Sequence, residues 1–257
     1  MLTIKKFIML GLGWLLVGCF SEPVSPHQAV ELLIKARQQN HTVELKKAES
    51  LIQNFGAEAV PELIRLFSHP DPGIQAAGVY ELRELGPLAI PGLLTSLKSG
   101  DLTVQKNCVW TLELINSPHV VPALLPLLSD RDVTLRVRTA RAIAILGDNR
   151  GYAFLINTLA DPNKDVRTLA IVQLSELDDP RNLIPLIEKL ADPDPFVRMS
   201  AIDALSRLGD ARAVPTLDTI RQEDTSWQVR RTAAAALTVI TGRPTTYINQ
   251  DGRATSP

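Results

Sequence analysis

The side chains that most often carry catalysis or bind metals are few and scattered in this sequence. The histidines are His27, His41, His69 and His119, and the cysteines are Cys19 and Cys108. Neither cysteine fits a metal-ligand spacing, and two cysteines do not make a disulfide framework. The chain also has no glycine-rich phosphate loop and no Gly-x-Ser-x-Gly nucleophile motif. These residue types predict no catalytic residue, no metal site, no cofactor and no small-molecule substrate.

Cys19 is the cysteine that the surrounding sequence marks for modification. Lys5 and Lys6 precede an apolar run of 11 residues, 7–17. A helix that crosses a bilayer needs about 20 apolar residues, so this run is too short to span one. It fits the apolar region of an export signal, and we expect residues 1–18 to be a signal peptide.

The last residues of this segment, LVGC at 16–19, resemble the lipobox of bacterial lipoproteins and depart from that pattern nowhere. The resemblance implies that the thiol of Cys19 is acylated with diacylglycerol and that the chain is cut just before it. Residues 19–26 would be the lipidated cysteine and a polar, proline-containing tether. The protein would then lie in the bacterial cell envelope, facing the periplasm or the cell exterior. A plain secretory signal, or an N-terminal anchor with a chance cysteine, is the alternative.

A pattern that recurs about every 31 residues predicts the elements that position the other side chains. Each copy has an apolar anchor residue, followed in most copies by arginine, as in Val197-Arg198. The anchors, with spacings of 30, 31, 31, 31 and 32, are Ile74, Val104, Leu135, Val166, Val197 and Val229. Good helix N-cap residues lie three positions earlier: Asp71, Asp101, Asp132, Asn163, Asp194 and Ser226. Each anchor is therefore expected to lie in the first turn of a helix.

The positions that follow each anchor show helical periodicity. Offset 4, counted from the anchor, is always small: Gly78, Cys108, Thr139, Ala170, Ala201 and Ala233. Offset 8 is always apolar: Leu82, Leu112, Ile143, Leu174, Leu205 and Leu237. Offsets 0, 4, 8 and 11 share one helical face, so each copy predicts an amphipathic helix of roughly 13 residues. The expected stop residues are Gly86, Asn116, Gly147, Asp178, Gly209 and Gly242.

A shorter helix is expected before each of these, usually with proline in its first turn, where an N–H has no intrahelical partner. Its expected starts are Val60, Ile90, Val121, Tyr152, Ile184 and Val214. The Asp-x-x-Val-Arg turn, the Ala-x-x-x-Leu helix and the Leu-Gly-Asp-x-Arg loop at 146–150 and 208–212 resemble HEAT repeats. They resemble more closely the short HEAT-like repeats of phycobilin lyases. The resemblance covers about 60–242 and implies an all-α solenoid, since a stack of repeats buries what one repeat cannot.

The rest of the chain is assigned around this stack. Residues 27–57 lack the turn motif but keep helical periodicity, so we predict an N-terminal helical cap there. Residues 58–242 would be six HEAT-like repeats. Residues 243–257 are polar and interrupted by proline and glycine, and we expect this C-terminal tail to be loose.

A partner is expected on the outward face of the second helix, since this helix lines the concave face of HEAT-like solenoids. At 100° per residue, offsets 2, 6 and 9 point away from the core. Offset 6 is occupied by Tyr80, Trp110, Arg141, Val172, Asp203 and Ala235. Large aromatics in adjacent repeats, with an arginine nearby, are typical of interfaces. We predict a partner-binding site at Tyr80, Arg83, Trp110, Arg141 and Val172. Ordinary scattered surface residues, or packing beneath the cap, are the alternatives.

Two further features favour structural roles over functional ones. The Asp-x-x-Val-Arg residues could form a charged ladder for a ligand. The favoured interpretation is that the aspartate caps its helix while the arginine reaches an aspartate or carbonyl of a neighbouring repeat. Cys108 occupies the small offset 4 and is interpreted as a core thiol, not a nucleophile.

Charge and motif content exclude some classes of function. The chain has 27 basic and 28 acidic residues, so it lacks the strong positive charge of most nucleic-acid-binding proteins. No histidine is followed by glutamate, so the iron-binding His-Glu pairs of the HEAT-like deoxyhypusine hydroxylases are absent. The sequence favours a lipid-anchored scaffold or assembly factor that binds another protein without catalysis of its own. A structural envelope lipoprotein without a specific partner and a phycobilin-lyase-like enzyme are the competing hypotheses.

Overall fold

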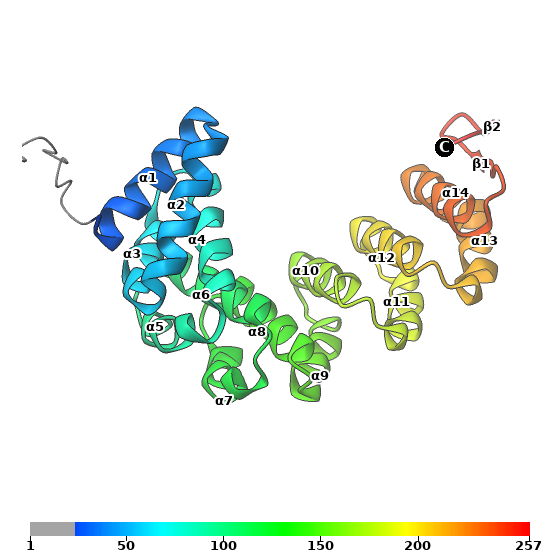
Figure 1. Cartoon of the computed structure of the whole chain (residues 1–257). Helices are drawn as coiled ribbons and strands as arrows, with labels where there is room; N and C mark the ends of the chain where they lie inside the picture. The colour runs from blue at the N-terminus through cyan, green and yellow to red at the C-terminus, as the bar shows by residue number, and fades with distance from the viewer. Residues whose placement is uncertain (1–23) are drawn as a thin grey trace, which may run out of the picture.

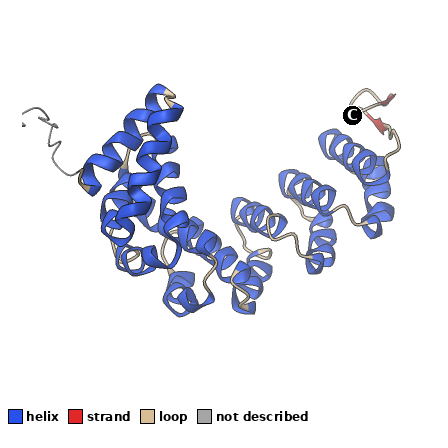
Figure 2. Ribbon diagram, in the orientation of Figure 1, coloured by secondary structure: helices blue, strands red, loops and turns tan. Residues whose placement is uncertain are grey.

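The computed structural model describes residues 24–257, so the signal peptide, Cys19 and most of the tether lie outside the described residues. The described chain is an all-α stack of helix pairs that forms an open arc (Figures 1 and 2). The α-helices are α1 (Pro26–Gln39), α2 (Thr42–Phe55), α3 (Val60–Arg65), α4 (Pro72–Leu85), α5 (Ile90–Ser96), α6 (Leu102–Ile115), α7 (Val121–Leu124), α8 (Val133–Ile145), α9 (Asn149–Thr158), α10 (Lys164–Ser175), α11 (Leu183–Glu188), α12 (Pro195–Leu208), α13 (Val214–Glu223) and α14 (Trp227–Thr241).

Short 3-10 segments extend most of the shorter helices at one end or both. They are η1 (Gly56–Ala59), η2 (Leu66–Ser68), η3 (Gly86–Ala89), η4 (Pro118–Val120), η5 (Leu125–Ser129), η6 (Pro180–Asn182), η7 (Lys189–Ala191) and η8 (Ala211–Ala213). The predicted solenoid is therefore confirmed, with each shorter helix built partly from tighter turns.

The two helices of each pair take different sides of the arc. The longer helices α4, α6, α8, α10, α12 and α14 line its inner side, and we call them the inner helices (Figure 1). The shorter helices α3, α5, α7, α9, α11 and α13 lie on its outer side and are the outer helices. Successive inner helices pack on one another, and α2 packs on α4 to close the N-terminal end.

The predicted signals for helix starts and ends act as expected. All six predicted N-cap residues cap the inner helices, and in all but Ser226 the side-chain oxygen accepts a hydrogen bond from a first-turn N–H. All six predicted stop residues have a positive φ, between 48° for Asp178 and 86° for Gly147. Four outer helices begin where predicted, α11 begins one residue early, and α9 begins at Asn149. The early start of α9 follows from Asp148, whose carboxylate accepts from the N–H of Arg150 at 2.9 Å.

The predicted helical phase places the core correctly. Every anchor and every residue at offset 8 is buried, and Leu205 is 0% exposed. The residues at offset 4 are small and buried in every repeat, and the first of them shows how close the outer helix comes. At Gly78, an added Cβ would lie 2.9 Å from the carbonyl oxygen of Leu63 in α3. Since real Cβ atoms do not approach so near, α3 and α4 could not keep this contact with a larger residue.

Two of the arginines beside the anchors, Arg167 and Arg198, tie neighbouring repeats together, as the structural interpretation of the Asp-x-x-Val-Arg turn predicts, whereas within residues 24–257 Arg136 binds only carbonyls of its own turn. Arg167 donates two hydrogen bonds of 2.8 Å to Asp192, and Arg198 donates two, of 2.7 and 2.8 Å, to Asp224. Each also donates to a carbonyl of its own turn. The partner carboxylates lie two residues before the cap residues, so the capping aspartates are not the ones that bind these arginines. Bidentate, largely buried pairs of this kind fix the rotation of one repeat on the next.

The C-terminal tail is not loose, contrary to the expectation from its composition. Its strands β1 (Tyr247–Ile248) and β2 (Ala254–Thr255) form an antiparallel hairpin, with Tyr247 only 7% exposed. Arg230 of α14 donates to the carbonyl of Ile248 at 2.7 Å, and Arg221 of α13 donates to that of Thr246 at 3.1 Å. Arg230 occupies the position that ties earlier repeats to their successors. In the last described repeat this arginine binds the tail instead.

None of the helices within residues 24–257 is long and apolar enough to cross a membrane.

The helical phase can be tested with two adjacent residues of α12. Leu205→Ala should lower the free energy of unfolding by about 2–5 kcal/mol, because it leaves a cavity in the core. Ser206→Ala, at a partly exposed neighbour, should change it by no more than about 0.5 kcal/mol. Urea denaturation of both variants gives the two values. Equal effects at the two positions would show that the assigned inward face is wrong.

Candidate protein-binding surface

The row at offset 6 of the inner helices is the predicted binding surface. These helices line the inner side of the arc (Figure 1), and offset 6 points away from the buried face of each helix. Tyr80 of α4 is 44% exposed and Val172 of α10 is 40% exposed. Trp110 of α6 and Arg141 of α8 are partly buried, while Asp203 and Ala235 are exposed. The row is therefore accessible at both ends and more closed near its middle.

Tyr80 and Trp110 form one aromatic unit across two repeats. Their ring centroids lie 5.9 Å apart with an interplanar angle of 73°, an edge-to-face contact. Trp110 also packs against the core, so one side of its ring supports the stack. Tyr80 packs against the Trp110 ring and still exposes much of its own side chain to solvent. Packing beneath the N-terminal cap therefore does not explain Tyr80, whereas burial explains part of Trp110.

Arg141, a predicted partner contact, forms ion pairs within the protein and is not a free arginine of the row. Its guanidinium donates two hydrogen bonds to Glu113 of α6, of 2.9 and 3.0 Å, and pairs with Glu176 of α10. Its side chain is only 18% exposed. Glu113 is buried, and desolvation raises the pKa of its carboxyl although Arg141 acts in the opposite direction. Arg141 therefore ties three consecutive inner helices and neutralises a buried charge.

Arg83 is exposed and follows Tyr80 by three residues on α4. Its Nη1 atom is 3.7 Å from a carboxylate oxygen of Glu84, in an ion pair that is exposed to solvent on both sides. Such surface pairs contribute little to stability, so Arg83 is available to a partner.

A hollow of about 410 Å³ opens beside Tyr80, at the N-terminal end of the inner side. Three helices build it: α1, α2 and α4. Its lining residues are Arg37, Glu49, Gln53, Tyr80, Glu81 and Glu84. We refer to it as the Tyr80 hollow. It did not emerge from the sequence because it combines the cap with the first repeat, and the cap carries no repeat motif.

Glu81 is the unusual residue of the Tyr80 hollow. It is only 5% exposed, yet no hydrogen bond or ion pair within residues 24–257 engages its carboxylate. Burial, followed by the negative charge of Glu49, raises the pKa of this carboxyl from its usual 4.5 to about 7, while Arg37 partly offsets the rise. Burial disfavours the ionised form, so this carboxyl binds a proton more readily near neutral pH than an exposed glutamate does.

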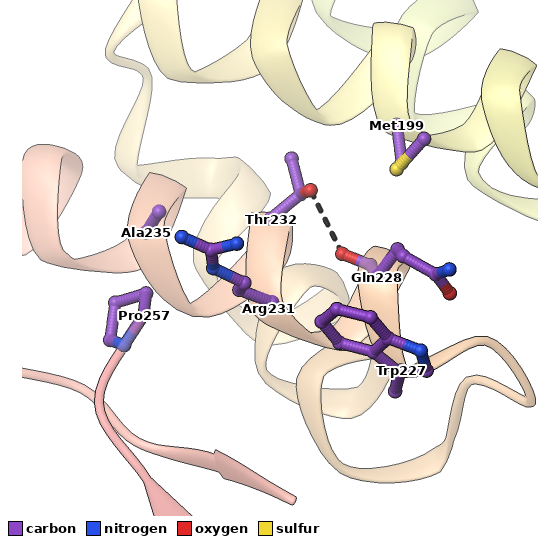
Figure 3. Close-up of a pocket in the computed structure, with 7 residues that line it drawn as sticks. All are labelled: Met199, Trp227, Gln228, Arg231, Thr232, Ala235 and Pro257. Carbon is purple, nitrogen blue, oxygen red and sulfur yellow. Dashed lines mark hydrogen bonds between the residues drawn. The ribbon is translucent and has the colours of Figure 1, made fainter. Parts of the chain in front are cut away.

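A second hollow, of about 360 Å³, lies on the inner side of the last repeats. Figure 3 shows Met199 from α12 facing Trp227, Gln228 and Arg231 of α14, with Pro257 of the tail beside Ala235. Sequence reasoning missed Trp227 because it considered only offsets 2, 6 and 9. At 100° per residue, offset −2 points in nearly the same direction, so the same pattern extended backwards would have found it.

The remaining residues that could do chemistry form no site. Within residues 24–257, no group of three or more His, Cys, Asp or Glu side chains could hold a metal ion. Cys108 is fully buried, and desolvation raises the pKa of its thiol to about 12, so the reactive thiolate is scarce at neutral pH. This agrees with its prediction as a core thiol. The predicted lipidation at Cys19 lies outside the described residues.

The sequence matches the HEAT-repeat family over residues 90–161 and 152–238, which together span more than half of the chain. No curated protein matches the chain. Many solved structures are similar in fold, and three of them illustrate the range. A designed armadillo repeat protein in complex with the peptide (KR)4 is 20% identical, with a TM-score of 0.45, over 83% of this chain and 98% of that one.

The complex of CpcE and CpcF of phycocyanin lyase from Nostoc sp. is 22% identical, with a TM-score of 0.34, over 69% of this chain and 97% of the other. Human deoxyhypusine hydroxylase is 15% identical, with a TM-score of 0.35, over 85% of this chain and 98% of the other. At these identities the likeness concerns the fold alone.

The burial of Glu81 predicts a pH-dependent cost to stability. The folded state raises the pKa of Glu81 above 4.5, so its stabilising effect is present below pH 4.5 and is lost as pH rises through about 7. Glu81→Gln should therefore stabilise the fold at pH 8 by on the order of 2–3 kcal/mol and change little at pH 4. Denaturant titrations at both values measure this. The exposed Glu223→Gln is the control, and an equal effect of the two variants at pH 8 would contradict the assignment.

Proposed function

This chain belongs to the HEAT-repeat proteins, and from that premise we propose that it is a lipid-anchored scaffold or assembly factor in a bacterial cell envelope. It binds another protein along the inner side of its N-terminal repeats. HEAT repeats form an extended concave surface of this kind from many small, similar units.

The exposed Tyr80 resting on Trp110 is the observation that carries this proposal. Tyr80 is 44% exposed and belongs to α4, one of the inner helices (Figure 1), where a bound partner would contact several repeats at once. Tyrosine, tryptophan and arginine are the residues that most often dominate the energy of protein interfaces. Arg83 beside the pair adds a polar contact at the edge of the same surface.

We infer that the protein has no catalysis of its own. The inert thiol of Cys108 and the scattered histidines support this inference, because neither offers an activated nucleophile or base. A phycobilin-lyase-like activity has only the shared repeat in its favour. A structural lipoprotein without a specific partner is the stronger competitor, and the exposed aromatic pair argues against it.

The membrane location of the proposal rests on the lipobox-like sequence at 16–19. Two acyl chains hold a protein stably at a bilayer, since each buried CH₂ contributes about 0.8 kcal/mol. Ser25 caps α1, so the residues between Cys19 and Ser25 would be the whole link between lipid and stack. This short link would keep the N-terminal end of the arc, and with it Tyr80, near the membrane surface.

Substitution of the aromatic pair tests the binding function. Tyr80→Ala should leave the free energy of unfolding within about 1 kcal/mol of the original, because the side chain is 44% exposed. It should weaken partner binding by more than about 2 kcal/mol. Trp110→Ala should weaken binding as well but also lower the melting temperature, because this ring is half buried. The control is Ile184→Ala, which also truncates a large exposed side chain. Ile184 is 59% exposed and lies on the outer helix α11, away from the proposed interface.

The measurement is recovery of proteins from solubilised bacterial membranes, quantified by mass spectrometry, with melting temperatures recorded in parallel. A partner should be captured by the original chain and by Ile184→Ala but not by Tyr80→Ala. Unchanged capture of every protein by Tyr80→Ala would remove the aromatic pair from the interface.

Lipid attachment is tested separately at its modified residue. Cys19→Ala should abolish acylation and leave the protein either uncleaved or, if cut elsewhere, free of the membrane. Intact-mass measurement and membrane fractionation report the two effects. A variant that keeps the original mass, apart from the substitution, and still sediments with membranes would refute the lipobox assignment.

A further inference from the structure

We propose that the Tyr80 hollow receives a lysine or arginine side chain from a basic segment of the bound partner protein. This inference rests on the proposed function, because the hollow adjoins the aromatic pair. It adds a chemical class to the partner, which must present at least one cationic side chain to this end of the arc.

The unpaired carboxylate of Glu81 is the first observation behind this assignment. Glu81 lines the hollow, is 5% exposed and has no hydrogen bond or ion pair with any described residue. Its carboxylate oxygens are not among the enclosed, unpartnered polar atoms of residues 24–257, so they face the open space of the hollow. A cation entering the hollow could therefore donate a hydrogen bond to this carboxylate. The hollow therefore offers an unpaired carboxylate to a cationic side chain.

The charges around the hollow favour the same occupant. Glu49 of α2 and Glu84 of α4 line it together with Glu81, whereas Arg37 of α1 is its only lining cation. Arg83 lies close by and pairs with Glu84. When Glu81 is ionised, the lining residues therefore carry three negative charges and one positive charge. An incoming ammonium or guanidinium group would be attracted to this end of the arc.

Tyr80 supplies an aromatic wall for the stem or the head of such a side chain. Two other rings in residues 24–257 already carry a cation of this chain, with Lys164 at 5.3 Å from Phe196 and Arg181 at 4.2 Å from Tyr152. No such contact within the described residues occupies Tyr80. A cation over an exposed tyrosine ring gains a modest further attraction. The ring and the carboxylates together match the mixed apolar and charged character of lysine and arginine.

An inorganic cation fits the hollow less well than a side chain. Its three carboxylates are not among any group that could hold a metal ion within residues 24–257. Divalent cations require several oxygen ligands at short and similar distances. A long side chain needs only one strong acceptor at its tip and apolar contact along its stem, which Glu81 and Tyr80 provide.

The titration of Glu81 gives the inference a measurable signature. A bound cation favours the ionised carboxylate, so binding should strengthen as pH rises through about 7. The ionised fraction rises about tenfold between pH 6 and pH 8 for such a group, and affinity should rise by up to the same factor. Arg37, Glu49, Glu84 and Arg83 also face or border the hollow, so this dependence must be assigned by substitution of Glu81 itself.

The experiment uses the full chain in detergent and a fluorescein-labelled hexalysine peptide as the probe. Fluorescence anisotropy gives the affinity at pH 6 and pH 8 and constant ionic strength. At pH 8, Glu81→Gln should weaken binding by about tenfold or more and abolish its pH dependence. Tyr80→Leu, which keeps an apolar side chain but removes the ring, should weaken it by about threefold. Glu223→Gln, the same charge change on the exposed surface of α13, should alter it by less than about twofold.

Three results would overturn the inference. Equal losses in Glu81→Gln and Glu223→Gln would show attraction to overall charge only. Equal binding of a hexa-acetyllysine peptide would show that no cation is recognised. Displacement of the probe by Ca²⁺, beyond the effect of NaCl at matched ionic strength, would identify a site for inorganic ions. Because the probe is a defined peptide, these results do not depend on whether Tyr80→Ala abolishes partner capture, so the two proposals can fail separately.

Discussion

The close approach of the two helices within each repeat is the constraint on which the rest of this molecule depends. At Gly78 the backbone of α3 leaves no room for a side chain, and the same offset holds small, buried residues in every other repeat. This contact fixes how each inner helix is rotated about its axis. Offset 6 lies 200° further round the helix, so it must face the inside of the arc. Because Gly78 faces α3, Tyr80, two residues further along α4, is turned toward solvent.

The two ends of the solenoid differ in how consecutive repeats are held together by the residue that follows each anchor. In the C-terminal repeats, Arg167 and Arg198 donate to buried aspartates of the following repeat. In the first repeats the same position holds Gln75 and Gln105, which donate only to backbone carbonyls. The N-terminal end therefore has fewer ionic ties of this kind, and there the carboxylate of Glu81 has no hydrogen bond or ion pair within residues 24–257. Arg141 marks the change, since it neutralises Glu113 in one direction and contacts Glu176 in the other.

The sequence repeat made most of the fold predictable, because six copies of one pattern place N-cap residues, helix ends and core residues at the same positions. What it could not show arises where a contact is made once. The hollow at Glu81 needs the cap helices, and the pairing of Arg141 needs two glutamates from different repeats. The folded tail needs the donors Arg221 and Arg230 of the last helix pair. The exposure of Tyr80 followed from helical phase, whereas the partial burial of Trp110 depended on how two neighbouring repeats approach each other.

Site-specific photo-crosslinking in intact bacterial membranes tests most directly whether the inner side of the N-terminal repeats is a protein interface. A photoreactive amino acid replaces Tyr80 on the inner side or, in a second variant, Ile184 on the outer side. If the interface is where we place it, irradiation joins a distinct protein to the chain from position 80 and not from position 184. No product at position 80, or the same products at both positions, would contradict it.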